Sequence, residues 1–310
     1  MNIFLRDDGK LRAGWRLAVS VLVMQAAAWL SVVLAGLLTS SEPRLRFVAV
    51  QRSLMLLFLF AGFSVLLITL DRVRQRPLAA MGLGLRQRWV LQSLAGIALG
   101  ALMVVAGVAA VAVGGTLKLQ FSINGSTLRL AVVVLLGLAA AAMAEEVMFR
   151  GYPFQRLVEG MGAAGAIVVS STFFGLVHAR NPSASFWSVL NTVLFGVLLA
   201  IAYLRSRSLW LPWGMHFGWN AALGVGFGLP VSGITWFAAL GQGRAEGPKW
   251  LTGGDYGLEA SAVGSVLIVV AIAAVVALTR LPALRAPDDS PPPPPHLGSM
   301  AGSGVAEGGV

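Results

Sequence analysis

The sequence contains no cysteine, and only 12% of its 310 residues are charged. The absence of cysteine excludes disulfide bonds and thiolate chemistry. A soluble domain usually has about 25% charged residues, so half that content excludes an ordinary water-soluble fold. Hydrophobic residues make up 57% of the chain and fall in runs of about twenty residues, the length of a membrane-spanning helix.

These apolar runs predict an all-α, polytopic membrane helix bundle with about eight transmembrane helices. Strands are not expected, because no ten-residue segment alternates with period two as in a membrane barrel. The predicted spans are Leu17–Leu38, Ser53–Leu70, Val90–Gly114, Leu130–Arg150 with an extension to about Leu157, Ala164–His178, Phe186–Leu204, Leu209–Leu229 and Ala260–Thr279.

Composition divides the chain into two parts. Residues 1–285 form the predicted membrane-embedded helical domain, and residues 286–310 are rich in Pro, Gly and Ser and predict a disordered tail. The tail contains a polyproline segment, Pro291–Pro295. The first apolar run has no small-residue cleavage pattern at its end, so it is interpreted as a retained helix rather than a signal peptide.

The net charge of +10 comes from basic residues that lie mostly in the short loops between apolar runs. Basic residues in such loops set membrane topology, so nucleic acid is not an expected partner. With both termini in the cytoplasm, 15 of the 23 Lys and Arg residues fall on the cytoplasmic side. We expect an integral membrane protein located in a bacterial inner membrane. Its first partner is then the lipid bilayer.

A small set of ionisable side chains interrupts the predicted spans. The stretch A-M-A-E-E-V-M-F-R ends one apolar run and carries Glu145, Glu146 and Arg150, while His178 and His216 lie in two later runs. Ionisable groups within a membrane helix are energetically costly, so each is a candidate functional residue.

Helix geometry separates the two glutamates. Glu146 and Arg150 are four residues apart with the acid first, which favours an ion pair, whereas Glu145 points about 100° away from Glu146. Glu145 is therefore predicted to face a cavity; the alternative is a single neutralising cluster of all three charges. His216 and Asn220 share a helix face. Gly214 and Gly218 of that helix predict a close neighbour.

Depth limits how these residues can meet. Glu145 and His178 lie about 23–27 Å along their helices from a predicted turn near Gly160–Gly162, so antiparallel packing brings them level. His216 lies only a few residues into its helix, which starts on the cytoplasmic side. All three reach one height if the hairpin projects beyond the bilayer.

A carboxylate opposite two imidazoles and an amide can hydrolyse an amide bond. Glu145 is the predicted base toward water, and His178 orients that water. His216 and Asn220 are predicted to donate to the oxyanion that develops on the scissile carbonyl. The sequence lacks H-E-x-x-H, G-x-S-x-G and P-loop motifs, which excludes the corresponding chemistries.

At these residues the sequence resembles the CPBP intramembrane proteases, the CAAX prenyl endopeptidase and bacteriocin-processing group, also called abortive-infection-like. The matching motifs are E-E-V-M-F-R for E-E-x-x-x-R, Phe174–His178 for F-x-x-x-H, and His216–Asn220 for H-x-x-x-N. They fall within a protease-like core at about residues 130–229.

The resemblance implies an eight-helix bundle whose catalytic cavity opens to the cytoplasm. It assigns water activation to Glu145 and His178, and oxyanion stabilisation to His216 and Asn220. The side chains of Glu146, Arg150 and Phe174 would shape the site. The implied substrate is a membrane-associated peptide or lipidated protein, either a prenylated CAAX-type end or a bacteriocin-like peptide.

Three alternatives remain open at this point. A catalytic zinc would use Glu145, His178 and His216 as ligands, although the glutamate mechanism requires no cofactor. A non-proteolytic binding or immunity protein would use the same polar cavity without cutting. A proton-coupled transporter would need polar residues across the whole membrane depth, which the sequence lacks.

Overall fold

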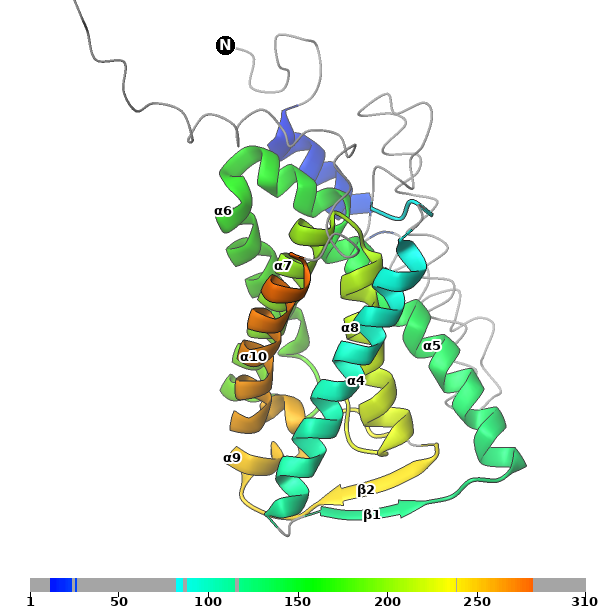
Figure 1. Ribbon diagram of the computed structural model, residues 1–310. Helices are drawn as coiled ribbons and strands as arrows, with labels where there is room; N and C mark the ends of the chain where they lie inside the picture. Colours follow the sequence, from blue (N-terminus) through cyan, green and yellow to red (C-terminus); the bar gives the residue numbers. More distant parts are fainter. Residues whose placement is uncertain are drawn as a thin grey trace, which may run out of the picture.

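The computed structural model describes residues 12–23, 26, 82–85, 88–114, 117–237 and 239–280. The predicted span Ser53–Leu70, most of Leu17–Leu38 and the predicted tail lie outside these residues. The described part of the chain is mostly helical, and Figure 1 shows its long helices extending between two ends of the molecule.

Three helical stretches in the described residues are long and apolar enough to cross a membrane: Trp89–Val113, Gly125–His178 and Phe186–Ser206. Two shorter apolar helices, Ala13–Val23 and Ala262–Leu278, accompany them. An ion pair between Arg16 and Glu159 joins the first of these short helices to the rest of the molecule. These features are those of a membrane helix bundle.

Local sequence explains where two of the helices begin. At α5 (Gly125–Arg150) the Asn124 side chain accepts hydrogen bonds from the backbone N–H groups of Ser126 and Thr127, at 3.0 and 3.1 Å. The Thr127 hydroxyl accepts in return from the Asn124 N–H. Ser185 and Ser188 form the same reciprocal capping box at α7 (Phe186–Ser206).

The predicted continuation of the α5 helix to Leu157 is wrong. The helix stops at Arg150, and α6 (Tyr152–His178) starts after Gly151, where a Cβ would lie 2.4 Å from the Val147 carbonyl oxygen. The predicted turn near Gly160–Gly162 does occur, because α6 bends at Gly162, whose φ is 77°. The first limb of α6 lies at the end of the molecule that also holds the N-terminal helix (Figure 1).

Helices α4 (Trp89–Val113) and α8 (Trp210–Asn220) approach closely because glycines face glycines. A Cβ on Gly214 would lie 2.4 Å from the Ser93 carbonyl oxygen, and one on Gly218 would lie 2.4 Å from that of Ile97. Gly96 and Gly100 of α4 have equally close contacts with α8. The close neighbour expected from Gly214 and Gly218 is therefore α4.

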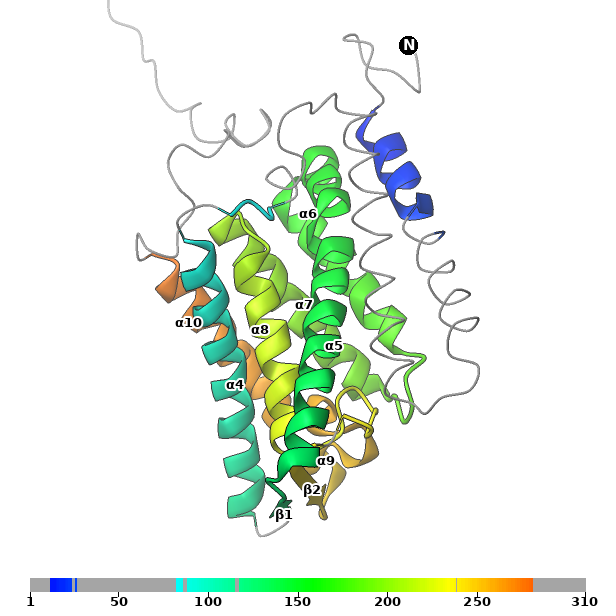
Figure 2. The ribbon, with the colours of Figure 1, turned by 90° about the vertical axis from the view of Figure 1, so that its right-hand side faces the viewer.

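The remaining long helices complete the bundle. α8 continues as a π-helical stretch, η1 (Ala221–Gly226), so the two together cover most of the predicted span Leu209–Leu229. α10 (Ala262–Leu278) packs against α7 and α4 (Figure 2). Apolar side chains from four helices meet in one core, including Val104, Leu198, Met215 and Ile268.

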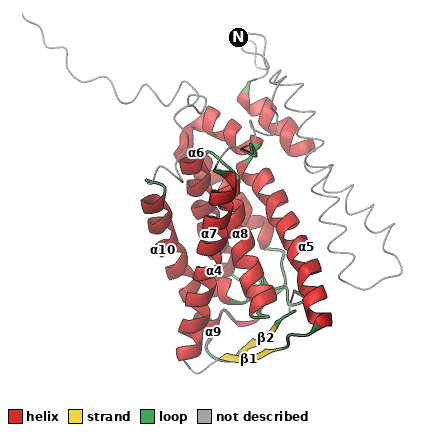
Figure 3. Cartoon of the chain, turned by 45° about the vertical axis from the view of Figure 1, so that its right-hand side comes forward, coloured by secondary structure: helices red, strands yellow, loops and turns green. Residues whose placement is uncertain are grey.

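The expectation that strands are absent is wrong at one end of the molecule. β1 (Leu117–Phe121) and β2 (Gly241–Ala245) pair antiparallel, with Leu119 opposite Gly243. Both strands are short and lie at the end opposite the first limb of α6 (Figure 3). The same end holds α9 (Lys249–Thr252) and the short 3₁₀ helices η2 (Gly254–Tyr256) and η3 (Leu258–Ala260).

Candidate active site

Three helices bring the predicted ionisable residues together. The Glu145 Oε2 atom lies 3.8 Å from Nε2 of His178 and 3.8 Å from Nε2 of His216. The second limb of α6, which follows the bend at Gly162, is held beside α5 by the Ser170 hydroxyl, which donates to the Phe149 carbonyl at 2.7 Å. Since the first limb of α6 projects beyond the bundle, Glu145 and His178 reach the same height.

The tautomer of His178 follows from its hydrogen bond. Its Nδ1 atom lies 2.7 Å from the Phe174 carbonyl oxygen, which can only accept. Nδ1 therefore carries the hydrogen, and the lone pair of the neutral ring lies on Nε2, the atom nearest Glu145. The Nε2 atom of His178 is thus oriented to accept a hydrogen bond at the centre of the site.

Glu146 connects two functional side chains. Its Oε1 atom accepts from the Arg150 guanidinium at 3.2 Å and lies 2.8 Å from Nδ1 of His216. Glu146 and Arg150 are fully buried, and a second Arg150 nitrogen donates to the Gly196 carbonyl at 3.2 Å. The predicted ion pair is present, and in addition Glu146 orients the His216 ring with Nε2 toward Glu145.

Phe174 shapes the site through three ring contacts. The Arg150 guanidinium lies over its ring, 4.4 Å from the centroid. The rings of His178 and His216 lie 4.6 and 6.1 Å from the same ring. Phe174 therefore separates the buried cation from the two imidazoles and limits their rotation.

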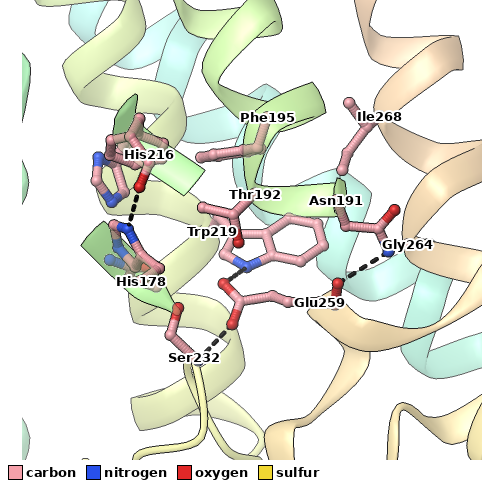
Figure 4. Close-up of a pocket in the computed structure, with 12 residues that line it drawn as sticks. His178, Asn191, Thr192, Phe195, His216, Trp219, Ser232, Glu259, Gly264 and Ile268 are labelled. Carbon is pink, nitrogen blue, oxygen red and sulfur yellow. Dashed lines mark hydrogen bonds between the residues drawn. The ribbon is translucent and has the colours of Figure 1, made fainter. Parts of the chain in front are cut away.

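Asn220 lies one turn after His216 and lines a pocket with both histidines. Among the described residues, its side-chain amide makes no hydrogen bond, so its two N–H donors are available to a ligand. The pocket is also lined by Trp219 and Phe195, whose rings are 5.8 Å apart. Figure 4 shows Trp219 and Phe195 together with the two histidines around the cavity.

Glu259 faces the histidines across this pocket and was not among the predicted site residues (Figure 4). Its carboxylate accepts from the Trp219 indole N–H at 3.0 Å and from the Ser232 backbone N–H. Burial raises the pKa of Glu259, although these donors and His178 oppose the shift. The sequence places Glu259 at the end of an apolar run and gives no sign that a bend returns it to the site.

The three predicted zinc ligands are farther apart than zinc requires. Zinc bonds of about 2.0–2.2 Å place tetrahedral ligand atoms roughly 3.3–3.5 Å apart, whereas Glu145 lies 3.8 Å from each imidazole. Within the described residues, no group of three His, Cys, Asp or Glu side chains could hold a metal ion. The geometry does not fit a zinc site.

The comparison with protein families identifies the central part of the chain. Residues 127–222 match the family described as type II CAAX prenyl endopeptidase Rce1-like. This region runs from the first turn of α5 to the end of α8 and includes all the predicted site residues, and the match confirms the resemblance drawn from the three motifs. No curated protein and no solved structure matches the chain.

The matched family is one of proteases of the CAAX prenyl endopeptidase type, which supports an enzyme. Together with the long apolar helices, it indicates an integral membrane protein.

Proposed function

We propose that this protein is an intramembrane endopeptidase that hydrolyses a peptide bond of a membrane-associated peptide with a glutamate-activated water. The observation that carries the proposal is the convergence of Glu145, His178 and His216, with 3.8 Å from the Glu145 carboxylate to each ring. The free amide of Asn220 lines the adjacent pocket.

The chemistry proceeds in two steps. Glu145 accepts a proton from water while His178 orients that water through Nε2, and the hydroxide attacks the carbonyl carbon of the scissile bond. In the second step the tetrahedral intermediate breaks its C–N bond, and Glu145 returns the proton to the departing amine. The products are a carboxylic acid and an amine, which become a carboxylate and an ammonium ion by proton exchange.

His216 and Asn220 stabilise the oxyanion of the intermediate. Since Nδ1 of His216 already donates to Glu146, Nε2 can donate only when the ring carries a second proton. The Glu146 carboxylate favours that imidazolium by charge and by its 2.8 Å hydrogen bond. Asn220 adds a neutral N–H donor, and removing one such donor typically lowers the rate by 10²–10³-fold.

The proposed setting is a bundle of about eight membrane-spanning helices in a bacterial inner membrane, with both termini in the cytoplasm. The distribution of Lys and Arg along the chain supports this orientation. No cofactor takes part in the proposed mechanism.

Comparative membrane proteomics tests the proposal in cells. Cells that carry Glu145→Gln should accumulate an uncut membrane-anchored peptide that is processed in wild-type cells. Glu246→Gln is the matched control, because the Glu246 side chain is 44% exposed just after β2 and, within the part of the chain that the structure describes, its ion-pair partners are Lys118 and Arg244. Identical peptide profiles for wild type and Glu145→Gln would contradict the proposal.

A further inference from the structure

The pocket beside the proposed catalytic residues has two chemically different walls. The near wall presents His178, which orients the water in the proposed mechanism, and His216, which with Asn220 stabilises the oxyanion. The far wall presents Glu259, Thr192 and Asn191 (Figure 4). The cavity between them measures about 30 Å³, which is room for about two water molecules.

The far wall offers hydrogen-bond acceptors. Thr192 already donates its hydroxyl hydrogen to the Ser188 carbonyl at 2.8 Å, so its oxygen can only accept. Each Glu259 oxygen accepts one hydrogen bond, from Trp219 or from Ser232, and retains a further lone pair. A ligand that suits this wall must donate several hydrogen bonds.

Asn191 holds Glu259 in place. Its side-chain nitrogen donates to the Glu259 and Ser261 carbonyl oxygens, both at 2.9 Å, and its oxygen accepts from Ser265 at 2.7 Å. All the polar atoms of the Asn191 side chain are therefore engaged with the segment that carries Glu259. The carboxylate is a preorganised feature of the pocket and does not depend on a flexible loop.

The far wall holds a carboxylate without a Lys or Arg partner. Among the residues that the structure describes, no Lys or Arg lines the pocket, and a protonated His178 is the cationic group that acts on Glu259. Burial raises the pKa of Glu259, whereas its hydrogen bonds and His178 oppose the shift. An incoming cation would compensate the charge and stabilise the ionised carboxylate.

We infer that the far wall is a subsite for the ammonium group of a lysine next to the cleaved bond, with Glu259 as the residue that determines this specificity. This inference rests on the proposed function. An ammonium group is a compact cation with three donors, and its head fits a space of about two waters better than a planar guanidinium does.

The same subsite does not suit a CAAX end. Such an end combines a prenylated cysteine with a free C-terminal carboxylate. The prenyl chain is apolar and cannot satisfy the acceptors of Glu259 and Thr192. We therefore expect a substrate that has lysine, and no prenyl group, beside the cleaved bond.

Peptide profiling of the full-length protein in liposomes tests the inference. The probes are synthetic palmitoylated peptides with Lys, norleucine or Glu on either side of the candidate bond, each made with an amidated and a free C-terminus. Wild type should cleave the Lys peptides about tenfold faster than the norleucine peptides, the effect of one charged hydrogen-bond interaction. Glu259→Gln should reduce this preference to less than twofold, and the control Glu246→Gln should retain it.

A binding measurement separates the inference from the proposed function. Amidated Lys peptide should bind Glu145→Gln protein about tenfold tighter than it binds the double variant Glu145→Gln/Glu259→Gln, while the norleucine peptide binds both equally. A Lys preference that persists without Glu259, or that wild type lacks, would overturn the inference. Cleavage that survives Glu145→Gln while the binding difference remains would overturn only the proposed function.

Discussion

Glu145 and Glu146 are adjacent in sequence but occupy different environments. Glu146 is fully buried between Arg150 and His216, whereas Glu145 is 19% exposed and approaches both histidines. The helical step of about 100° per residue separates them. Glu145 is therefore suited to proton transfer, whereas Glu146 balances the charge of Arg150 and orients the His216 ring.

Removing the buried carboxylate should destabilise the protein more than changing its neighbour does. Glu146→Ala leaves Arg150 buried without its carboxylate, and breaking a buried pair in this way typically costs about 3–5 kcal/mol. Glu145→Gln leaves the pair intact and should have a smaller effect. Thermal unfolding in detergent measures both variants, and equal shifts in Tm would contradict the separation of roles.

Local sequence predicts some site residues because their spacing is a property of one helix. The i,i+4 relations of Glu146 with Arg150 and of His216 with Asn220 follow from helix geometry alone. The hydrogen bond from His216 to Glu146 joins residues 70 positions apart, and Glu259 reaches the pocket only through the fold of the segment before α10. Sequence spacing carries no information about such contacts.

At the scale of elements, the predicted spans Val90–Gly114 and Phe186–Leu204 agree with α4 and α7 to within two residues at each end. The helix α4 begins after Arg88 and ends before Gly114, and α7 begins at the Ser185–Ser188 capping box, which are local signals. The break at Gly151 and the β1–β2 pairing depend on packing with distant segments, so hydropathy does not predict them. The L-K-L-Q-F sequence of β1 does alternate, but five residues are a weak signal.

The glycine contact between α4 and α8 should control the position of His216 and Asn220. Gly218→Ala places a Cβ 2.4 Å from the Ile97 carbonyl oxygen, so the helices must separate. We expect a loss of about 1–3 kcal/mol in stability and up to about 10²-fold in peptide hydrolysis, because catalysis depends on geometry.

Gly160→Ala is the matched control for the glycine contact, because a Cβ at Gly160 has no atom within 4 Å. Tm in detergent and the rate on a cleaved peptide report the two effects. A Gly218→Ala protein with the Tm and rate of wild type would show that close α4–α8 packing does not position the site.

At the scale of the whole molecule, the absence of cysteine allows a direct test of orientation. Gln120→Cys lies exposed on β1, and Gly160→Cys lies exposed on the first limb of α6 at the opposite end. With both termini cytoplasmic, a membrane-impermeant maleimide added to intact cells should label Gln120→Cys alone. Labelling of Gly160→Cys alone would reverse the proposed topology.

The buried side chain of Glu259, in η3, should make the stability of the protein depend on pH. Burial raises the pKa of Glu259 above its unfolded value of about 4.3, so the folded state binds this proton more tightly. Its contribution to stability therefore falls as pH rises from about 4.3 through the folded pKa, and levels off above it. Glu259→Gln, which cannot ionise, should show a flatter dependence of Tm on pH; an unchanged slope would contradict this assignment.

The cavity, the charges and the helix packing all bear on one claim, that Glu145 activates water for peptide hydrolysis. The most direct measurement is the single-turnover cleavage rate of purified wild type, Glu145→Gln and Glu246→Gln on a peptide that wild type cuts, with and without a chelator. The account predicts a loss of about 10²–10⁴-fold for Glu145→Gln, and no effect of Glu246→Gln or of the chelator. A Glu145→Gln enzyme that cuts at the wild-type rate, or a wild-type enzyme that stops cutting when stoichiometric zinc is removed, would contradict it.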